Sequence, residues 1–304
     1  MDEPILQVKD FRKTYGDFVA VENISFEVYP GEIFGLLGPN GAGKTSTLES
    51  LEGLRSPDGG SLQIAGIDPG KNPSGLKNLI GVQLQSSGLP ESITVEEAMK
   101  FFAAYHQVEP RYDLIDRLGL EEKRKTQYHQ LSTGQQRRLS LALAIAHRPQ
   151  VLFLDEPTAG LDVATRVELH QIMHELKEEG ATIILATHDM AEAEEMSDRI
   201  AILLNGRLAA TGTPMEITAA GSQLTKVSVR TQHNSLDGLN SSLPAVRQHL
   251  FKDSYNIYFS DEIGATVAAI IEHVKKHKDS LIDLRVERPS LEDRFLEITN
   301  PGDK

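Results

Sequence analysis

The chain has 304 residues, enough for one large domain and a small one, and its lack of cysteine excludes a disulfide framework. Its formal net charge of -13 leaves no excess of lysine or arginine to cover phosphates, so we expect no primary role in nucleic-acid binding. The longest apolar stretch, residues 139–146, is too short for a membrane span, and the acidic N-terminus carries no signal-peptide pattern. Any role at a membrane would therefore come through a partner.

The first segment predicts β structure. Residues 5–30 alternate, with Ile24, Phe26 and Val28 set against polar neighbours, which is typical of antiparallel strands. The apolar run 33–37 then predicts a buried strand.

Residues 38–45 read GPNGAGKT and fit the pattern G-x-x-x-x-G-K-[ST] between that strand and an expected helix over 44–54. Glycines let the backbone N–H groups turn inward around an anion, and the start of the helix adds its positive end. We therefore predict a nucleoside triphosphate site rather than a plain glycine-rich turn. Lys44 would reach the β- and γ-phosphates, and the Thr45 hydroxyl would ligate Mg²⁺. The predicted nucleotide-binding residues of this segment are Gly38, Pro39, Asn40, Gly41, Ala42, Gly43, Lys44, Thr45 and Ser46.

The middle of the chain predicts a helical subdomain over about residues 92–147. The turn signal PDGG at 57–60 precedes a short strand over 61–64. Thr94, with Glu97 three residues later, forms a capping-box pattern that opens a helix through Ala103.

The pentapeptide LSTGQ at residues 131–135 opens an amphipathic helix through His147. A glycine-centred turn that starts a helix is a second place where backbone N–H groups can meet an anion. Taken alone, a plain helix cap formed by Ser132 explains the pattern equally well.

The apolar run 151–154 predicts a buried strand that ends in Asp155 and Glu156. Ligands of α/β sheets bind at the carboxyl ends of the strands, so both carboxylates are candidate site residues. Asp155 would hold the Mg²⁺ shell, and Glu156 would orient or deprotonate a water molecule against the γ-phosphate. The alternative, that the two residues merely start a loop, is disfavoured by the phosphate loop upstream.

Two further apolar runs, 182–185 and 200–204, predict buried strands, with a crossover helix over about 163–179. Together with the runs 33–37 and 151–154, they predict an α/β fold with a mostly parallel sheet.

After about residue 221 the pattern changes, and residues 219–223 are a plausible linker. We predict an ATP-binding domain over residues 1–221 and a small α/β accessory domain over 222–304. The latter would contain strands over 226–230, 256–260 and 281–286, a helix over 264–275, and a last helix capped by Ser290. This domain carries no phosphate-loop or carboxylate motif, so we expect no role for it in ATP chemistry.

The segments GPNGAGKT, LSTGQ, VLFLDEPTAGLD and ATHDM, in this order and spacing, resemble the nucleotide-binding subunit of an ATP-binding cassette (ABC) transporter. The resemblance covers residues 4 to about 221. It implies a P-loop NTPase core with an antiparallel β subdomain and a helical subdomain, and ATP and Mg²⁺ as ligands.

The same resemblance suggests further site residues. Tyr15 would stack on adenine, although a half-exposed strand tyrosine is the simpler reading. His188 would contact the γ-phosphate, although a lone histidine is more often structural. Asp162 lies in the segment 159–162, which resembles the loop that joins the two subunits across their interface. The signature residues that would contact ATP held by a second subunit are Leu131, Ser132, Thr133, Gly134 and Gln135.

Two positions are less clear. The glutamine that contacts Mg²⁺ and senses the membrane partner is either Gln85, which the family spacing favours, or Gln83. Thr133 stands where the family commonly has glycine, so we expect a tighter fit around its methyl group.

One motif set per chain implies a homodimer, or a heterodimer with a similar chain. Residues 289–296 resemble the C-terminal end of daunorubicin, multidrug and sodium exporter ATPases, except that Arg294 replaces an apolar residue. We therefore expect an ATPase that powers a membrane exporter through a separate permease, at the cytoplasmic face of the cell membrane. In such an assembly, residues 222–304 would set dimer contact or permease docking, or only add buried surface. The alternatives are a soluble ABC ATPase acting on ribosomes or DNA, and a regulatory module that holds nucleotide without turnover. The transported substrate cannot be read from this chain.

Overall fold

The computed structural model describes residues 3–83, 88–221, 224–236, 239 and 243–299. The chain forms two compact units, residues 1–214 and 215–304. The domain boundary predicted from the sequence lies after residue 221, whereas the division of the structure falls at the first residue of α8 (Pro214–Ala219) and groups the rest of this helix with the second unit. Gly221 lies against the side chains of Arg294 and Glu297 in the last helix, which accounts for this grouping.

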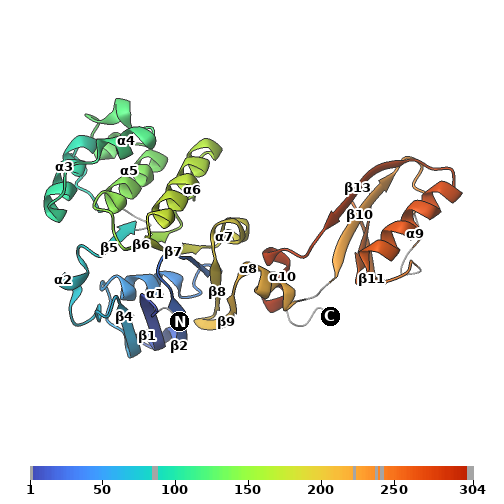
Figure 1. The fold of residues 1–304 in the computed structure, drawn as a ribbon, viewed down its shortest axis with the longest axis horizontal. Coiled ribbons are helices and arrows are strands. Elements are labelled where there is room, and N and C mark those ends of the chain that lie inside the picture. Colours follow the sequence, from blue (N-terminus) through green and yellow to red (C-terminus); the bar gives the residue numbers. More distant parts are fainter. Residues whose placement is uncertain (1–2, 84–87, 222–223, 237–238, 240–242, 300–304) are drawn as a thin grey trace. The chain divides into compact units, whose positions relative to one another are not determined.

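The N-terminal unit contains two sheets (Figure 1). The antiparallel sheet has the order β2-β1-β4, with β1 Leu6–Tyr15, β2 Phe18–Val28 and β4 Gly59–Ile64. The larger sheet has the order β5-β6-β7-β3-β8-β9 and is parallel except for β9. Its strands are β3 Ile33–Leu37, β5 Ile80–Gln83, β6 Val151–Asp155, β7 Thr182–Thr187, β8 Arg199–Leu204 and β9 Arg207–Gly212.

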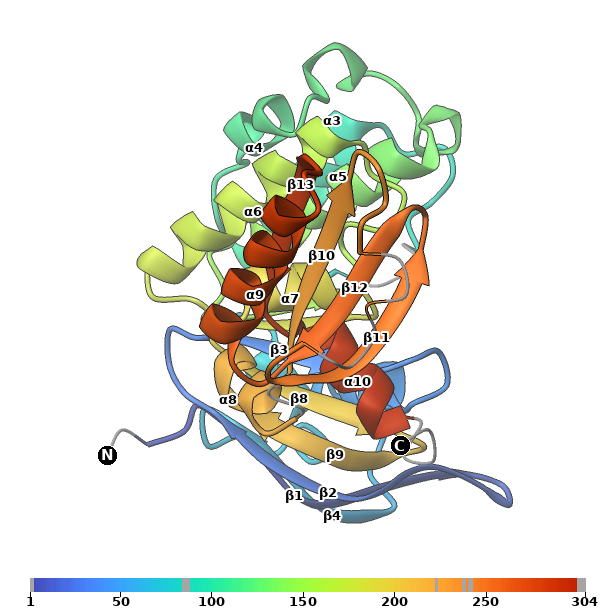
Figure 2. The same cartoon turned by 90° about the vertical axis from the view of Figure 1, so that its right-hand side faces the viewer.

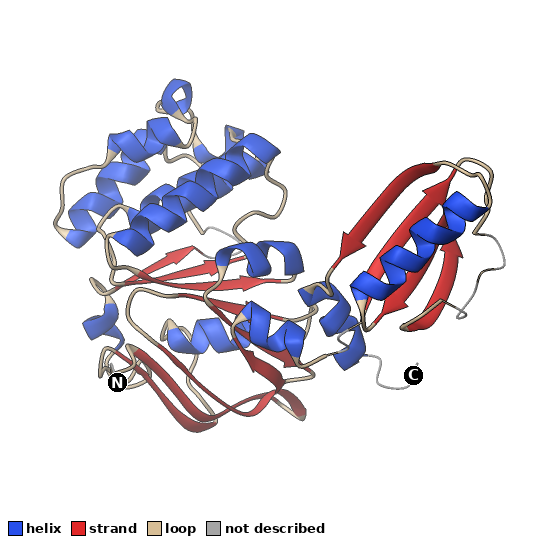
Figure 3. Cartoon of the chain, turned by 45° about the vertical axis from the view of Figure 1, so that its right-hand side comes forward, coloured by secondary structure: helices blue, strands red, loops and turns tan. Residues whose placement is uncertain are grey.

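Helices cover the larger sheet on both faces, as Figure 3 shows. The helices of this unit are α1 Lys44–Leu51, α2 Pro73–Leu76, α3 Val95–His106, α4 Tyr112–Arg117, α5 Thr133–Ile145, α6 Val163–Glu178 and α7 Met190–Met196, with short 3₁₀ turns at Glu121–Lys123 and Tyr128–Gln130. Because strand side chains alternate, Leu152 and Leu154 of β6 pack toward the α3–α6 layer. Val151 and Phe153 instead face the antiparallel sheet and α1.

Local sequence signals explain where several helices begin and end. The capping box predicted at Thr94 is formed, and the helix cap considered at Ser132 is present as a second capping box. Asp162 caps α6 through a 2.9 Å bond from the Thr165 N–H. The prediction that α1 continues to residue 54 was wrong. The helix ends at Leu51 because Gly53 adopts a left-handed conformation with φ +77°.

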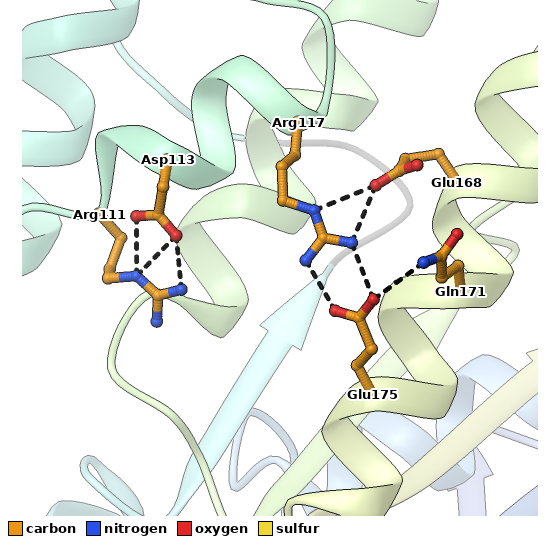
Figure 4. Close-up of polar contacts among 6 residues, drawn as sticks. All are labelled: Arg111, Asp113, Arg117, Glu168, Gln171 and Glu175. Atoms are coloured by element: carbon orange, nitrogen blue, oxygen red, sulfur yellow. Dashed lines mark hydrogen bonds and ion pairs between the residues drawn. The ribbon is translucent and has the colours of Figure 1, made fainter.

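A charged network joins α4 to α6 in the helical subdomain (Figure 4). The Arg117 guanidinium donates to Glu168 at 2.9 Å and to Glu175 at 2.7 Å, and Gln171 also donates to Glu175. Arg111 and Asp113 form a separate pair at the start of α4. These side chains are partly exposed, and exposed ion pairs add little to the free energy of unfolding. The network therefore serves mainly to orient α4 against α6.

The C-terminal unit is an antiparallel sheet of order β11-β12-β10-β13 with α9 on one face (Figure 2). Its strands and remaining helices are β10 Thr225–Thr231, β11 Val246–Lys252, β12 Tyr255–Ser260, β13 Leu281–Glu287, α9 Ile263–Lys276 and α10 Leu291–Thr299. Val227 and Val229 of β10 pack against Ile270 and Val274 of α9. The sequence analysis identified three of the four strands and missed β11, whose sequence VRQHLFK lacks a clean alternation.

Candidate nucleotide-binding site

The loop between β3 and α1 packs so tightly that glycine is required at two of its positions. A Cβ atom at Gly43 would lie 2.7 Å from the carbonyl oxygen of Ala20, and φ there is +102°. A Cβ atom at Gly38 would lie 2.3 Å from the carbonyl oxygen of Leu203. The loop therefore depends on both glycines for its path.

Lys44 is buried at the start of α1, with its ammonium group turned back over the loop. Its Nζ donates to the carbonyl oxygen of Gly38 at 2.6 Å and of Pro39 at 3.5 Å. The same nitrogen lies 3.7 Å from Glu156 Oε1. Burial lowers the pKa of Lys44, while Glu156 and Asp155 act in the opposite direction. The ammonium group thus sits between the loop and two carboxylates.

Thr45 and Asp155 bring the start of α1 to the end of β6. The Thr45 hydroxyl donates to Asp155 Oδ2 at 3.2 Å. Burial raises the pKa of Asp155 and the neighbouring Glu156 adds to the shift, while the Thr45 hydrogen bond and Lys44 lower it. Such a pair of hard oxygen donors suits Mg²⁺, which prefers few protein ligands together with phosphate oxygens.

Glu156 follows β6 with a left-handed backbone, φ +51°, which is unusual for a residue with a side chain. Its N–H donates to the carbonyl oxygen of Ala186 at 2.9 Å. Its Oε2 lies 2.7 Å from Nδ1 of His188, which follows β7. Only 8% of Glu156 is exposed, whereas 58% of the His188 side chain is accessible. The buried carboxylate of Glu156 thus lies between Lys44 and an accessible imidazole. It stands on a backbone conformation of the strained kind that is frequent at functional sites.

These residues surround a cavity of about 350 Å³, which is within the size range of small-molecule sites. Its lining combines the phosphate loop, the carboxyl end of β6 and the turn between β1 and β2. The lining residues are Tyr15, Phe18, Ala20, Pro39, Asn40, Gly41, Ala42, Gly43, Lys44, Thr45, Ser46, Asp155 and Glu156.

Tyr15 and Phe18 form the aromatic side of this cavity. The Tyr15 hydroxyl donates to Ser46 Oγ at 3.2 Å, and 38% of the residue is exposed. Lys13 and Arg55 lie 5.5 and 5.3 Å from the centre of its ring. The sequence analysis singled out Tyr15 but missed Phe18, which is 62% exposed. No local sequence pattern marks Phe18, because it reaches the cavity only through the hairpin of β1 and β2.

The signature residues 131–135 do not line this cavity. Ser132 caps α5, and a Cβ atom at Gly134 would lie 3.8 Å from the Gly160 carbonyl oxygen. Arg137 of α5 donates to the carbonyl oxygens of Glu156 and Ala159. The signature therefore lies beside the segment that leads from Glu156 to Asp162, and Asp162 is likewise absent from the cavity lining.

The structure describes only one of the two candidate sensor glutamines. Gln85 lies outside the described residues. Gln83, at the end of β5, is 3% exposed, and its Oε1 has no hydrogen-bond partner within the part of the chain that the structure describes.

Glu52 is a titratable residue near the site that the sequence analysis missed. Burial raises its pKa to about 8, and the carboxylates of Asp155 and Glu49 add to the shift. Its Oε2 has no hydrogen-bond partner among the described residues. The folded chain therefore prefers Glu52 in its protonated form.

This preference predicts how the stability of the nucleotide-free protein depends on pH. Between about pH 4.5 and 8 the folded state holds a proton that the unfolded state has released, so the free energy of unfolding falls as pH rises, by up to about 1.4 kcal/mol per unit. Glu52→Gln removes the titrating carboxyl group, so the free energy of unfolding no longer falls with rising pH on account of this residue. We expect the variant to match the parent near pH 5 and to exceed it by about 2–4 kcal/mol near pH 8.5, measured by urea unfolding. Glu122→Gln, at an exposed glutamate outside the charges that act on Glu52, is the matched control. An unchanged pH dependence in Glu52→Gln would contradict the assignment.

The family model described as "ABC transporter" matches residues 21–159. The linearmycin resistance ATP-binding protein LnrL of Bacillus subtilis is 30% identical over an alignment of 312 positions, which covers 97% of this chain and 98% of that protein. The chain belongs to the ABC transporter ATP-binding protein family.

Other members of the ABC family support this assignment. The Nod factor export ATP-binding protein I of Ralstonia nicotianae is 34% identical, covering 97% of this chain and 94% of that protein. The probable multidrug ABC transporter ATP-binding protein YbhF of Escherichia coli is 36% identical over 71% of this chain and 38% of that protein.

A solved ATP-binding subunit of an ABC transporter is 30% identical, with a TM-score of 0.67 over 71% of this chain and 92% of that chain. CbiO1 of Clostridium perfringens, part of the ABC transporter complex cbiONQ, is 30% identical with a TM-score of 0.62 over 72% and 92%. The expected ABC fold is thereby confirmed, and the chain is an ATP-binding protein of a family that hydrolyses ATP. Across the described residues, no helix has the length and apolar character needed to cross a bilayer.

Proposed function

We propose that this ABC ATPase powers a membrane exporter as one of two ATPase subunits attached to a separate permease. One observation carries the proposal. The phosphate loop, Asp155 and Glu156 surround a single cavity, whereas the signature and Asp162 lie outside it.

In this proposal ATP occupies the cavity. Its adenine stacks on Tyr15, and its phosphates bind the N–H groups of the loop and the Lys44 ammonium. Thr45 and Asp155, with Gln85, would hold Mg²⁺, which supplies positive charge to the β- and γ-phosphate oxygens. The 3.2 Å contact between the Thr45 and Asp155 oxygens supports this fit.

Glu156 is placed to activate the attacking water molecule. Its buried carboxylate accepts a proton from water as the water oxygen attacks the γ-phosphorus and the bond to the β-phosphate oxygen breaks. His188 contacts Glu156 from the exposed side, where it can orient the carboxylate and meet the γ-phosphate. The products are ADP and phosphate.

The signature completes the site only if it comes from a second subunit. Ser132 sits at the N-terminus of α5, whose positive end suits a phosphate. Since this helix end does not reach the cavity of its own chain, a partner chain would present it to the γ-phosphate. ATP held between two subunits joins them, and its hydrolysis loosens that contact and can move an attached permease.

The names of related proteins support the exporter role, and a place at the inner face of the membrane follows from attachment to a permease. LnrL and the Nod factor protein, which cover nearly the whole chain, are named for resistance and export. The exporter-like C-terminal end forms α10, with Ser290 and Asp293 in a reciprocal cap. Arg294, which departs from that motif, pairs with Glu297 at 2.9 Å.

Substitutions of Ser132 test the composite site. Ser132→Arg places a bulky charge in the signature, so we expect turnover to fall at least about 100-fold while the chain still binds a fluorescent ATP analogue. Ser132→Asp keeps a good N-cap for α5 but opposes the phosphate charge, so it should also lose turnover.

Ser132→Thr and Gln130→Arg are the controls. The first keeps the hydroxyl, and the second places the same charge on an exposed neighbour, so both should keep most of the activity. Normal turnover in Ser132→Asp would show that Ser132 only caps the helix and would sink the composite-site proposal.

A further inference from the structure

The C-terminal unit has an edge strand whose sequence is complementary to itself. Among the described residues β13 pairs with β10 on one side, and the sheet ends there. Exposed edge strands usually carry lysine, proline or other features that prevent pairing with another chain. Residues 281–287, LIDLRVE, contain neither lysine nor proline.

β13 also exposes apolar side chains. Ile282 is 52% exposed, Leu281 is 44% exposed and Val286 is 43% exposed. Leu284, between them, packs against the cluster that includes Ile270 of α9. A row of apolar side chains on a sheet edge is typical of a strand that meets a partner.

The charges of β13 indicate which partner fits. Asp283 and Arg285 flank Leu284, and they contact one another at 2.9 Å. In an antiparallel pair related by a two-fold axis, residues directly opposite share one face of the sheet. Centring the axis on Leu284 places Asp283 of each copy opposite Arg285 of the other. Both residues lie in the part of β13 that pairs with β10 in regular register, whereas that register shifts between Asp283 and Leu281.

The other registers about a two-fold axis oppose like charges or pair less of the strand. Centring on Arg285 places it opposite itself and Asp283 opposite Glu287, so like charges meet. Centring on Asp283 places that carboxylate opposite itself. Centring on Val286 places Arg285 opposite Glu287, so opposite charges meet, but it pairs only residues 285–287 of the strand.

The opposite edge, β11, offers no such match. Its charged side chains, Arg247 and Lys252, are both basic, so any self-pairing of β11 lacks opposite charges. Asp283 is suited to an ionic role because a hydrogen bond from Tyr255 and the nearby Arg285 lower its pKa.

We propose that β13 is a docking edge for a second copy of this chain, paired antiparallel about Leu284 so that two C-terminal sheets join into one. This contact needs no nucleotide, and it is separate from the composite ATP site. It would keep two ATPase subunits together when ATP has left.

Charge exchange between two full-length variants tests the pairing. Asp283→Arg and Arg285→Asp each place like charges opposite one another in a homodimer, so each alone should dissociate at least about tenfold more readily than the parent. Mixing the two restores both opposite pairs, so the mixture should associate within about threefold of the parent. Sedimentation equilibrium without nucleotide and with EDTA measures this apart from any ATP-driven dimer, and circular dichroism checks that each variant is folded.

Cysteine scanning tests the register, because the chain has no cysteine of its own. Leu284→Cys should form a disulfide-linked dimer on mild oxidation, while Val286→Cys and the β11 control Leu250→Cys should not. A parent that stays monomeric without nucleotide, single variants that associate normally, or a mixture that fails to recover would each overturn the proposal. A disulfide dimer of Val286→Cys in place of Leu284→Cys would overturn the register.

Discussion

Replacing Glu156 by glutamine is expected to lower ATP turnover by about 100- to 10,000-fold while leaving ATP affinity within a fewfold of the parent. The amide keeps the size of the side chain but cannot accept the proton of the attacking water. Lys44, Thr45 and Asp155 remain to hold the nucleotide, since their contacts with the loop and with each other do not depend on the Glu156 charge. Steady-state phosphate release and titration with a fluorescent ATP analogue measure the two effects.

Glu49→Gln is the matched control for this change. Glu49 pairs with Arg55 on the surface of α1 and does not line the cavity, so its loss should leave turnover near the parent rate. Hydrolysis at the parent rate in Glu156→Gln would remove Glu156 from the catalytic role.

Lys44→Ala should act on binding itself. Lys44 is the only lysine or arginine among the described residues that line the cavity, and a charged hydrogen bond to phosphate is worth about 1.5–3 kcal/mol. Its loss also leaves Glu156 and Asp155 facing the triphosphate without a nearby ammonium group. We expect ATP affinity to fall at least about 100-fold in the fluorescent titration.

Lys13→Ala provides the comparison. The Lys13 ammonium lies near Tyr15 but pairs with Asp58 at 3.1 Å, outside the phosphate loop. Its removal should change ATP affinity by no more than a fewfold. Equal effects of the two substitutions would mean that Lys44 acts only as a nearby positive charge and does not contact the phosphates.

The phosphate loop was readable from sequence because its geometry leaves few residue choices. Gly43 has φ +102°, and both it and Gly38 approach other backbone closely. The run 151–154 was equally informative, since a strand buried on both faces must be apolar. Its carboxyl end carries Asp155, and ligands of α/β sheets bind at the carboxyl ends of the strands.

Other features depend on contacts that no local pattern reveals. The raised pKa of Glu52 comes from burial and from carboxylates brought near by folding. Phe18 reaches the cavity only because β1 and β2 form a hairpin beside the loop. The end of α1 was misplaced because Gly53 stops the helix although the apolar pattern continues to Leu54.

The sequence alone could not show whether LSTGQ serves the site of its own chain. The pattern at Ser132 is satisfied as a helix cap within one chain. The structure adds that the phosphate loop lines the cavity and the signature does not. This difference is the basis for proposing a site shared by two subunits.

Cross-linking between two differently tagged chains tests that account most directly. Asn40 of the phosphate loop and Thr133 of the signature are both exposed, and the chain contains no other cysteine. One Glu156→Gln chain would carry Asn40→Cys and the other Thr133→Cys, joined by a short thiol cross-linker. The account predicts a cross-linked product of the two tags when ATP and Mg²⁺ are added, and little with ADP or without nucleotide. A yield that ATP does not change, in chains shown to bind ATP, would contradict a site shared between subunits.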